Sequence, residues 1–148
     1  MQDGVVKRPS TLTVIDYSRP STLPRFWVLD LATHFSNDAD SHQSSLGLFV
    51  TENAYTGKNG YSLRLRGLEP SNDRAIERAI VIHGASYVSE DTAQSLGRLG
   101  RSWGCPALRP AVAHDVIDRL KEGSVVFSYY PDSSWMQQSP FLGGCSGA

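Results

Sequence analysis

The run Tyr61-Ser-Leu-Arg-Leu-Arg66 alternates apolar and polar side chains, and it directly follows the turn-like stretch Tyr55-Thr-Gly-Lys-Asn-Gly60. Such period-two alternation is typical of a strand with one buried face, and glycine and asparagine favour tight turns. The earlier run Leu46-Gly-Leu-Phe-Val-Thr51 reads as a second strand. These three segments together predict a hairpin and favour a fold built mainly of β-strands.

Further strands are predicted on both sides of this hairpin. The segments 11–16 and 25–31 are rich in β-branched and aromatic residues, and residues 18–24 between them contain two prolines, so they predict another hairpin. Ala79-Ile-Val-Ile-His83 and Ser124-Val-Val-Phe-Ser-Tyr-Tyr130 supply two more strands. The expected fold class is therefore mainly β, a β-sandwich or mixed sheet.

One amphipathic helix and shorter helical turns complete the expected fold. Pro110 suits the first turn of a helix that ends just before Gly123. Its predicted apolar stripe is Val112, Val116, Ile117 and Leu120. Ser89 can cap a short helix that Gly97 ends, and residues 74–78 suit a helical turn.

The length and composition indicate a single domain. With 148 residues we expect one domain over residues 1–132 and a peripheral tail over 133–148, with a monomer favoured. A net charge of -1 provides no basic field for phosphate backbones, so nucleic acid is not an expected partner. The four histidines lack metal-ligand spacing, and we expect neither a metal nor another cofactor.

Membrane and export signals are missing from the chain as given. No apolar run is long enough to span a bilayer. The start Met-Gln-Asp-Gly lacks the basic and apolar regions of a signal peptide, which leaves either a cytoplasmic protein or a chain that begins after a cleavage site.

Cys105 is the first candidate for chemistry. It ends the stretch Gly97-Arg-Leu-Gly-Arg-Ser-Trp-Gly-Cys105, whose three glycines suit a tight loop with backbone amides close to another molecule. A buried structural thiol is the alternative, since free cysteine is among the most buried residue types. A core cysteine would normally lie in an apolar periodic run, so these polar and glycine-rich flanks favour a catalytic thiol.

A catalytic thiol needs a base and an oxyanion site, and the sequence offers candidates for both. His83 ends a predicted strand and can act as the base for Cys105. The backbone amides of Trp103, Gly104 and Cys105 can converge on an oxyanion. A backbone carbonyl or Ser102 would orient the imidazole, and the sequence does not choose between them. The alternative for His83 is a structural, hydrogen-bonded histidine.

At these residues the sequence resembles a known family. Ile82-His-Gly84 followed by Ser102-Trp-Gly-Cys105 resembles the paired signature of YkuD-type L,D-transpeptidases. Three further stretches are similar to the murein L,D-transpeptidase branch of that family: residues 44–49, the cysteine loop with Cys105-Pro-Ala107, and residues 127–132. The resemblance covers residues 11–132.

The resemblance implies a periplasmic or secreted, cofactor-independent enzyme that uses peptidoglycan stem peptides in building the cell wall and cell shape. Cys105 would attack a carbonyl at diaminopimelate, expel D-alanine and hold a thioester until an acceptor amine arrives. The acceptor sets the product: a 3-3 or 1-3 cross-link, hydrolysis by an L,D-carboxypeptidase, or D-amino-acid exchange. Carbapenems would acylate the same thiol. A noncatalytic peptidoglycan-binding module is the alternative from another class.

Two departures from the family pattern concern substrate binding. Many relatives carry arginine two positions after the cysteine, where this chain has Ala107, so Arg101 or Arg98 would take over a carboxylate-binding role, unless they are solvated loop charges. Relatives also have another strand and a turn where Ala32-Thr33 here joins two elements directly. Substrate-groove candidates are Gly84, Tyr87 and Trp103, although aromatic residues beside a strand end are often packing groups. Cys145 is an unpaired thiol or a disulfide partner.

Overall fold

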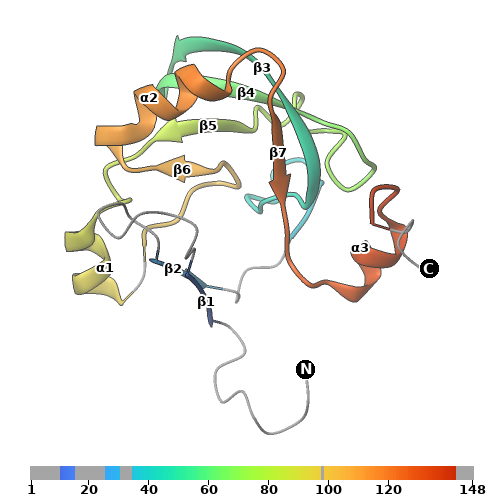
Figure 1. The fold of residues 1–148 in the computed structure, drawn as a ribbon, viewed down its shortest axis with the longest axis horizontal. Helices are drawn as coiled ribbons and strands as arrows, with labels where there is room; N and C mark the ends of the chain where they lie inside the picture. Colours follow the sequence, from blue (N-terminus) through green and yellow to red (C-terminus); the bar gives the residue numbers. More distant parts are fainter. Residues whose placement is uncertain (1–10, 16–25, 31–34, 98, 143–148) are drawn as a thin grey trace, which may run out of the picture. The chain divides into compact units, whose positions relative to one another are not determined.

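The computed structural model describes residues 11–15, 26–30, 35–97 and 99–142, and the chain divides into two units, 1–34 and 35–148 (Figure 1). In the first unit, β1 (Thr11–Ile15) and β2 (Phe26–Asp30) pair antiparallel, with Thr11 opposite Asp30. This pairing confirms the hairpin predicted for segments 11–16 and 25–31.

The second unit contains a five-stranded mixed sheet. Its strands lie in the order β6-β5-β4-β3-β7, and only the β5–β6 pair is parallel. Their bounds are β3 (Gly47–Gly57), β4 (Gly60–Gly67), β5 (Val81–Gly84), β6 (Ala107–Leu108) and β7 (Val125–Ser128). The predicted mainly β class is confirmed.

The central hairpin is longer than the sequence pattern predicted. The strand expected over residues 46–51 continues as β3 to Gly57, where a tight turn leads into β4 at Gly60, whose φ is +75°. The register shifts between Thr51 and Ala54, which is an irregularity in the ladder. A bulge of this kind interrupts the period-two alternation but not the strand, and this explains the early predicted end.

The described residues of the second unit form three helices, of which two were expected. Helix α1 (Glu90–Leu96) begins after Ser89, whose hydroxyl accepts the Thr92 N–H at 3.2 Å, and ends at Gly97 with φ +67°. Helix α2 (Pro110–Leu120) has proline in its first turn. Helix α3 (Ser133–Gln138) was not predicted. Its N-cap is Asp132, whose side chain accepts the Trp135 N–H at 2.8 Å.

Helix α2 covers one face of the sheet, but with a stripe rotated from the predicted one. Val112 is 45 % exposed, and the buried positions are Ala113 and Ile117. Gly84 permits this packing, because a Cβ there would lie 3.0 Å from the Ala113 Cβ. The prediction of Val112 as a core-facing residue was therefore wrong: a close approach to β5 selects the small Ala113 instead.

The hydrophobic core lies between α2 and the sheet. Its buried members are Phe49, Leu63, Leu65, Ala75, Ile80, Ile82 and Ile117. Because neighbouring residues of a strand point to opposite faces, Ile82 faces this core while His83 faces the other side of the sheet. The core therefore fixes the direction in which the candidate histidine points.

A buried carboxylate connects α3 to the sheet through hydrogen bonds. Glu69 is 3 % exposed, and its two oxygens accept the Leu48 N–H at 2.5 Å and the Trp135 indole N–H at 3.2 Å. Trp135 is itself buried. The domain boundary at residue 132 stays a prediction, while α3, which follows it, contacts the sheet unit directly.

Replacing Glu69 by alanine is expected to lower the free energy of unfolding by about 2–5 kcal/mol, because two buried N–H donors lose their acceptor. Chemical denaturation measures this change. Glu77→Ala is the matched control, since Glu77 is exposed and, among the described residues, forms an ion pair only with Arg74. Equal effects of the two substitutions would contradict the prediction.

Candidate active site

The parallel pairing of β5 and β6 brings His83 to the cysteine segment. His83 lies opposite Ala107 in this pairing, and the His83 N–H donates to the Pro106 carbonyl at 3.2 Å. Cys105 directly precedes this point at the amino end of β6. Although they are 22 positions apart in sequence, His83 on β5 and Cys105, two residues before β6, thus lie in neighbouring segments, as expected from the sequence.

The Cys105 thiol is half-buried and turned toward the start of β5. Its Sγ donates to the Ala79 carbonyl at 3.7 Å, and its side chain packs against the hydrophobic core. Burial raises the pKa of the thiol, while a hydrogen bond from the Val81 backbone and the charge of Arg78 lower it. Among the described residues, no hydrogen bond joins Sγ to the His83 imidazole.

The His83 imidazole is oriented by a backbone carbonyl. His83 is 6 % exposed, and its Nδ1 lies 3.0 Å from the Gly84 oxygen. A carbonyl can only accept, so Nδ1 carries the proton and Nε2 keeps its lone pair. The Ser102 hydroxyl donates instead to the Cys105 carbonyl, at 2.5 Å. Of the two candidates for orienting His83, the Gly84 carbonyl is therefore the one in contact with it.

Gly104 occupies a position where no side chain fits. It is buried with φ +89°, and a Cβ on it would lie 2.4 Å from the Gln43 backbone oxygen. Left-handed backbone combined with a close backbone neighbour requires glycine. This glycine lets the cysteine loop lie directly against the loop that contains Gln43.

The three predicted groove residues differ in their surroundings. Tyr87 is half-buried, its carbonyl accepts the Gly100 N–H at 3.1 Å, and burial raises the pKa of its phenol. Trp103 is 72 % exposed, and its ring stacks on His42 with centroids 4.3 Å apart. Gly84, by contrast, serves the packing of α2 described above. Their roles in substrate binding stay predictions.

Of the two arginine candidates for binding a carboxylate, Arg101 lies in the described part of the chain. Arg101 is exposed and makes no hydrogen bond or ion pair with the described part of the chain. Arg98, Cys145 and the Ala32-Thr33 junction lie outside the described residues. Arg101 is thus available for a carboxylate, and this role stays a prediction.

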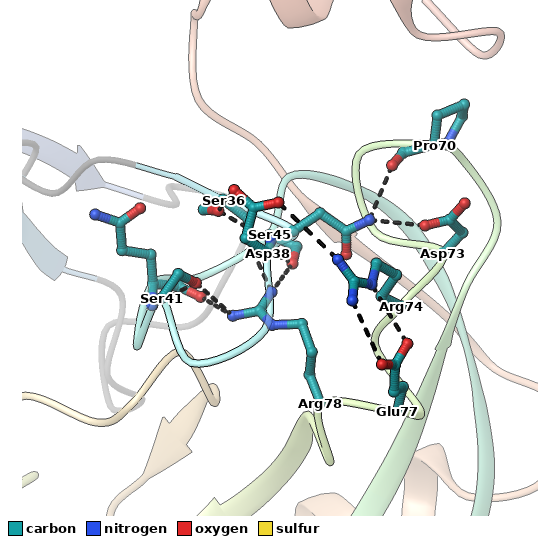
Figure 2. Close-up of polar contacts among 11 residues, drawn as sticks. Ser36, Asp38, Ser41, Ser45, Pro70, Asp73, Arg74, Glu77 and Arg78 are labelled. Atoms are coloured by element: carbon teal, nitrogen blue, oxygen red, sulfur yellow. Dashed lines mark hydrogen bonds and ion pairs between the residues drawn. The ribbon is translucent and has the colours of Figure 1, made fainter.

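Arg78 lies beside the cysteine loop and was not among the site residues predicted from sequence. Figure 2 shows its guanidinium reaching the loop formed by residues 36–45. Nη1 donates to the Ser36 carbonyl at 2.8 Å and the Ser45 hydroxyl at 2.6 Å, and Nη2 to the Ser41 hydroxyl at 3.1 Å and the Gln43 carbonyl at 2.6 Å. No sequence pattern signals these contacts, because the four acceptors precede Arg78 by 33 to 42 residues and none recurs periodically.

A mixed sheet with the histidine on β5 and the cysteine just before the parallel strand β6 fits the class that the signature motifs indicate. Residues 31–129 match the family model of the L,D-transpeptidase catalytic domain of the YkuD type. The chain therefore belongs to the YkuD-type L,D-transpeptidase family, an enzyme family associated with the cell wall and with peptidoglycan as substrate.

Two other comparisons give no match. No curated protein and no solved structure is significantly similar to the chain. In the described part of the chain, no helix has the length and apolar character needed to cross a membrane.

Proposed function

We propose that this protein is a peptidoglycan L,D-transpeptidase in which Cys105 is the nucleophile and His83 its base. The observation that carries the proposal is the family match over residues 31–129, which contains both residues. The pairing of β5 with β6, which sets His83 beside the cysteine segment, supports the assignment. The substrate is a stem peptide, and its reacting carbonyl belongs to the L-centre of diaminopimelate.

Acylation begins with transfer of the thiol proton to His83. The Gly84 carbonyl holds Nδ1–H, so Nε2 is the nitrogen that takes the proton. Burial raises the pKa of the Cys105 thiol, so the resting sulfur is mostly protonated and needs this base. For the transfer, the thiol turns from the Ala79 carbonyl toward the imidazole.

The thiolate then forms a carbon–sulfur bond with the carbonyl, and the carbon–nitrogen bond to D-alanine breaks. The imidazolium gives its proton to the leaving amine, so D-alanine departs neutral at that nitrogen. The N–H groups of Gly104 and Cys105 donate to no described residue, which supports their use as oxyanion donors together with Trp103.

Deacylation reverses the roles. An acceptor amine loses a proton to His83 and attacks the thioester carbonyl. The new carbon–nitrogen bond forms as the carbon–sulfur bond breaks, and the imidazolium returns its proton to the Cys105 sulfur. A second stem peptide gives a 3-3 or 1-3 cross-link, while water gives L,D-carboxypeptidase activity and a free D-amino acid gives exchange. The exposed guanidinium of Arg101, which pairs with no described residue, is the candidate that binds a stem-peptide carboxylate.

The location that suits this reaction is the periplasm or the cell surface, where peptidoglycan is found. We expect the protein to act there as a monomer, without a metal or other cofactor. Carbapenems, whose strained amide resembles an activated acyl donor, are expected to acylate the same thiol.

Incubation with a tetrapeptide stem should add the mass of the acyl group to the protein and release D-alanine, and Cys105→Ala should abolish both. Intact-protein mass spectrometry and a D-alanine assay measure these outcomes. Cys145→Ala is the matched control and should form the adduct normally. Cross-linked dimeric stems distinguish transpeptidation from hydrolysis. A wild-type protein that binds stems without forming an adduct would instead be a noncatalytic binding module.

A further inference from the structure

Arg78 is a charged residue that forms no ion pair with an acid among the described residues. Its guanidinium makes four hydrogen bonds of 2.6–3.1 Å to the 36–45 loop, and every acceptor is a neutral carbonyl or hydroxyl oxygen. No carboxylate of the described residues lies within ion-pair distance of it. Neighbouring Arg74, in contrast, pairs with Glu77 and Asp38 (Figure 2). Asp38 acts on the charge of Arg78 electrostatically but forms no ion pair with it, so the groups that hold the guanidinium in place are neutral.

The same guanidinium lies against the residue that precedes the candidate nucleophile. A Cβ built on Gly104 would lie 3.5 Å from Arg78 Nη2 and 2.4 Å from the Gln43 oxygen to which Nη2 donates. On the other side, Ala79 follows Arg78 directly, and its carbonyl accepts from Cys105 Sγ at 3.7 Å. Arg78 thus reaches the cysteine loop both through its side chain and through its backbone neighbour.

Arg78 is also the cation that acts on the sulfur. Its charge lowers the pKa of the Cys105 thiol against the larger effect of burial, and burial lowers the pKa of Arg78 itself. The other titratable groups near the sulfur are Tyr87, which interacts electrostatically with Cys105, and His83 on the adjacent strand. A guanidinium that is fixed and half-buried stabilises a nearby anion more than a fully solvated guanidinium does.

We propose that Arg78 is a positioning residue for the Cys105 nucleophile: it holds the 36–45 loop against Gly104 and keeps a positive charge beside the sulfur. This inference rests on the proposed role of Cys105. It assigns to Arg78 part of the stabilisation of the thiolate, in addition to the role of His83. His83 remains the base that removes the proton.

The test compares the pH dependence of Cys105 alkylation by iodoacetamide in the wild type, Arg78→Lys, Arg78→Met and Arg74→Met. Peptide mass spectrometry follows Cys105 and Cys145 separately, so Cys145 reports any general change in reagent reactivity. Thermal melts establish that each variant is folded. Arg74→Met is the matched control, because it removes an exposed arginine one turn away that does not contact Gly104.

Arg78→Met removes the favourable charge, so the midpoint of Cys105 alkylation should rise by about 0.5 pH unit or more, and the rate at pH 7 should fall about threefold or more. Arg78→Lys keeps the charge but not the two-sided hydrogen bonding, and it should lie between wild type and Arg78→Met. The shift should shrink at high salt, which a purely structural role would not cause. A folded Arg78→Met variant with the wild-type profile would overturn the proposal.

If Arg78→Met does not fold, Arg78→Lys and Ser45→Ala replace it in the alkylation experiment. Each weakens the hydrogen bonding between Arg78 and the 36–45 loop without removing the charge. Both should slow D-alanine release through kcat, with KM little changed. Alkylation needs no peptide substrate, so it tests the role of Arg78 separately from the proposed transpeptidase function. A shifted profile in a protein without tetrapeptide turnover would refute the proposed function alone. Normal Cys105-dependent turnover with an unshifted profile would refute the role of Arg78 alone.

Discussion

His83→Asn should lower kcat/KM for D-alanine release from a tetrapeptide stem by about 100- to 10,000-fold, the usual contribution of a general base. Asparagine places its amide nitrogen near the position of Nδ1, so it can still donate to the Gly84 carbonyl that orients His83. It lacks a counterpart of Nε2, the atom that takes the thiol proton. The substitution therefore removes the base while keeping its anchoring hydrogen bond.

The matched control for this prediction is His114→Asn. His114 is exposed on α2, where it stacks on Tyr61 and contacts Asp118, so its loss should leave turnover unchanged. Because His83 is buried, a thermal melt of each variant must accompany the kinetics. A folded His83→Asn variant that releases D-alanine at the wild-type rate would exclude His83 as the base.

The parts of the fold that the sequence predicted well are those set by local signals. The central hairpin follows from alternation and an Asn-Gly turn, and α1 from a serine cap and a glycine end. The two hairpins and α1 depend on residues close together in sequence. Their sequence patterns are recognisable because the local backbone of each turn, strand or helix end favours particular residue types.

The features that were missed depend on distant partners. Strand β6 has two residues, too few to show any period, and it exists because β5 supplies its hydrogen bonds. Helix α3 is short, and its docking depends on the contact of Trp135 with Glu69, 66 positions earlier. The core face of α2 was misjudged at Val112 because the close approach of Gly84 is a property of the packed structure.

The candidate site divides in the same way. The motifs around His83 and Cys105 were recognisable in sequence, and the parallel pairing of their segments agrees with the expected proximity. The direction of the sulfur was not predictable, since it depends on the Ala79 carbonyl. The contacts of Arg78 were not predictable either, because its acceptors lie in a polar loop without a pattern. Sequence motifs thus identified the candidate reacting groups, while the fold determines the orientation of the sulfur and the charged group near it.

Gly104→Ala is expected to lower tetrapeptide turnover at least about 100-fold, as loss of an oxyanion donor does, and to lower thermal stability as well. The new Cβ would lie 2.4 Å from the Gln43 backbone oxygen, a distance that real contacts do not tolerate, so the loops must separate. Such a shift moves the Gly104 and Cys105 amides and loosens the contact with Arg78. D-Alanine release and a thermal melt measure the two effects.

Gly123→Ala separates the effect of crowding from that of backbone strain. Gly123 has φ +104°, close to the +89° of Gly104, but a Cβ there would meet nothing within 4 Å. Both substitutions carry the cost of a left-handed alanine, about 1–2 kcal/mol, but only Gly104→Ala adds the collision with Gln43. We therefore expect Gly123→Ala to lose some stability and keep its turnover. Equal turnover in the two variants would show that the contact between the cysteine loop and the 36–45 loop is not required for catalysis.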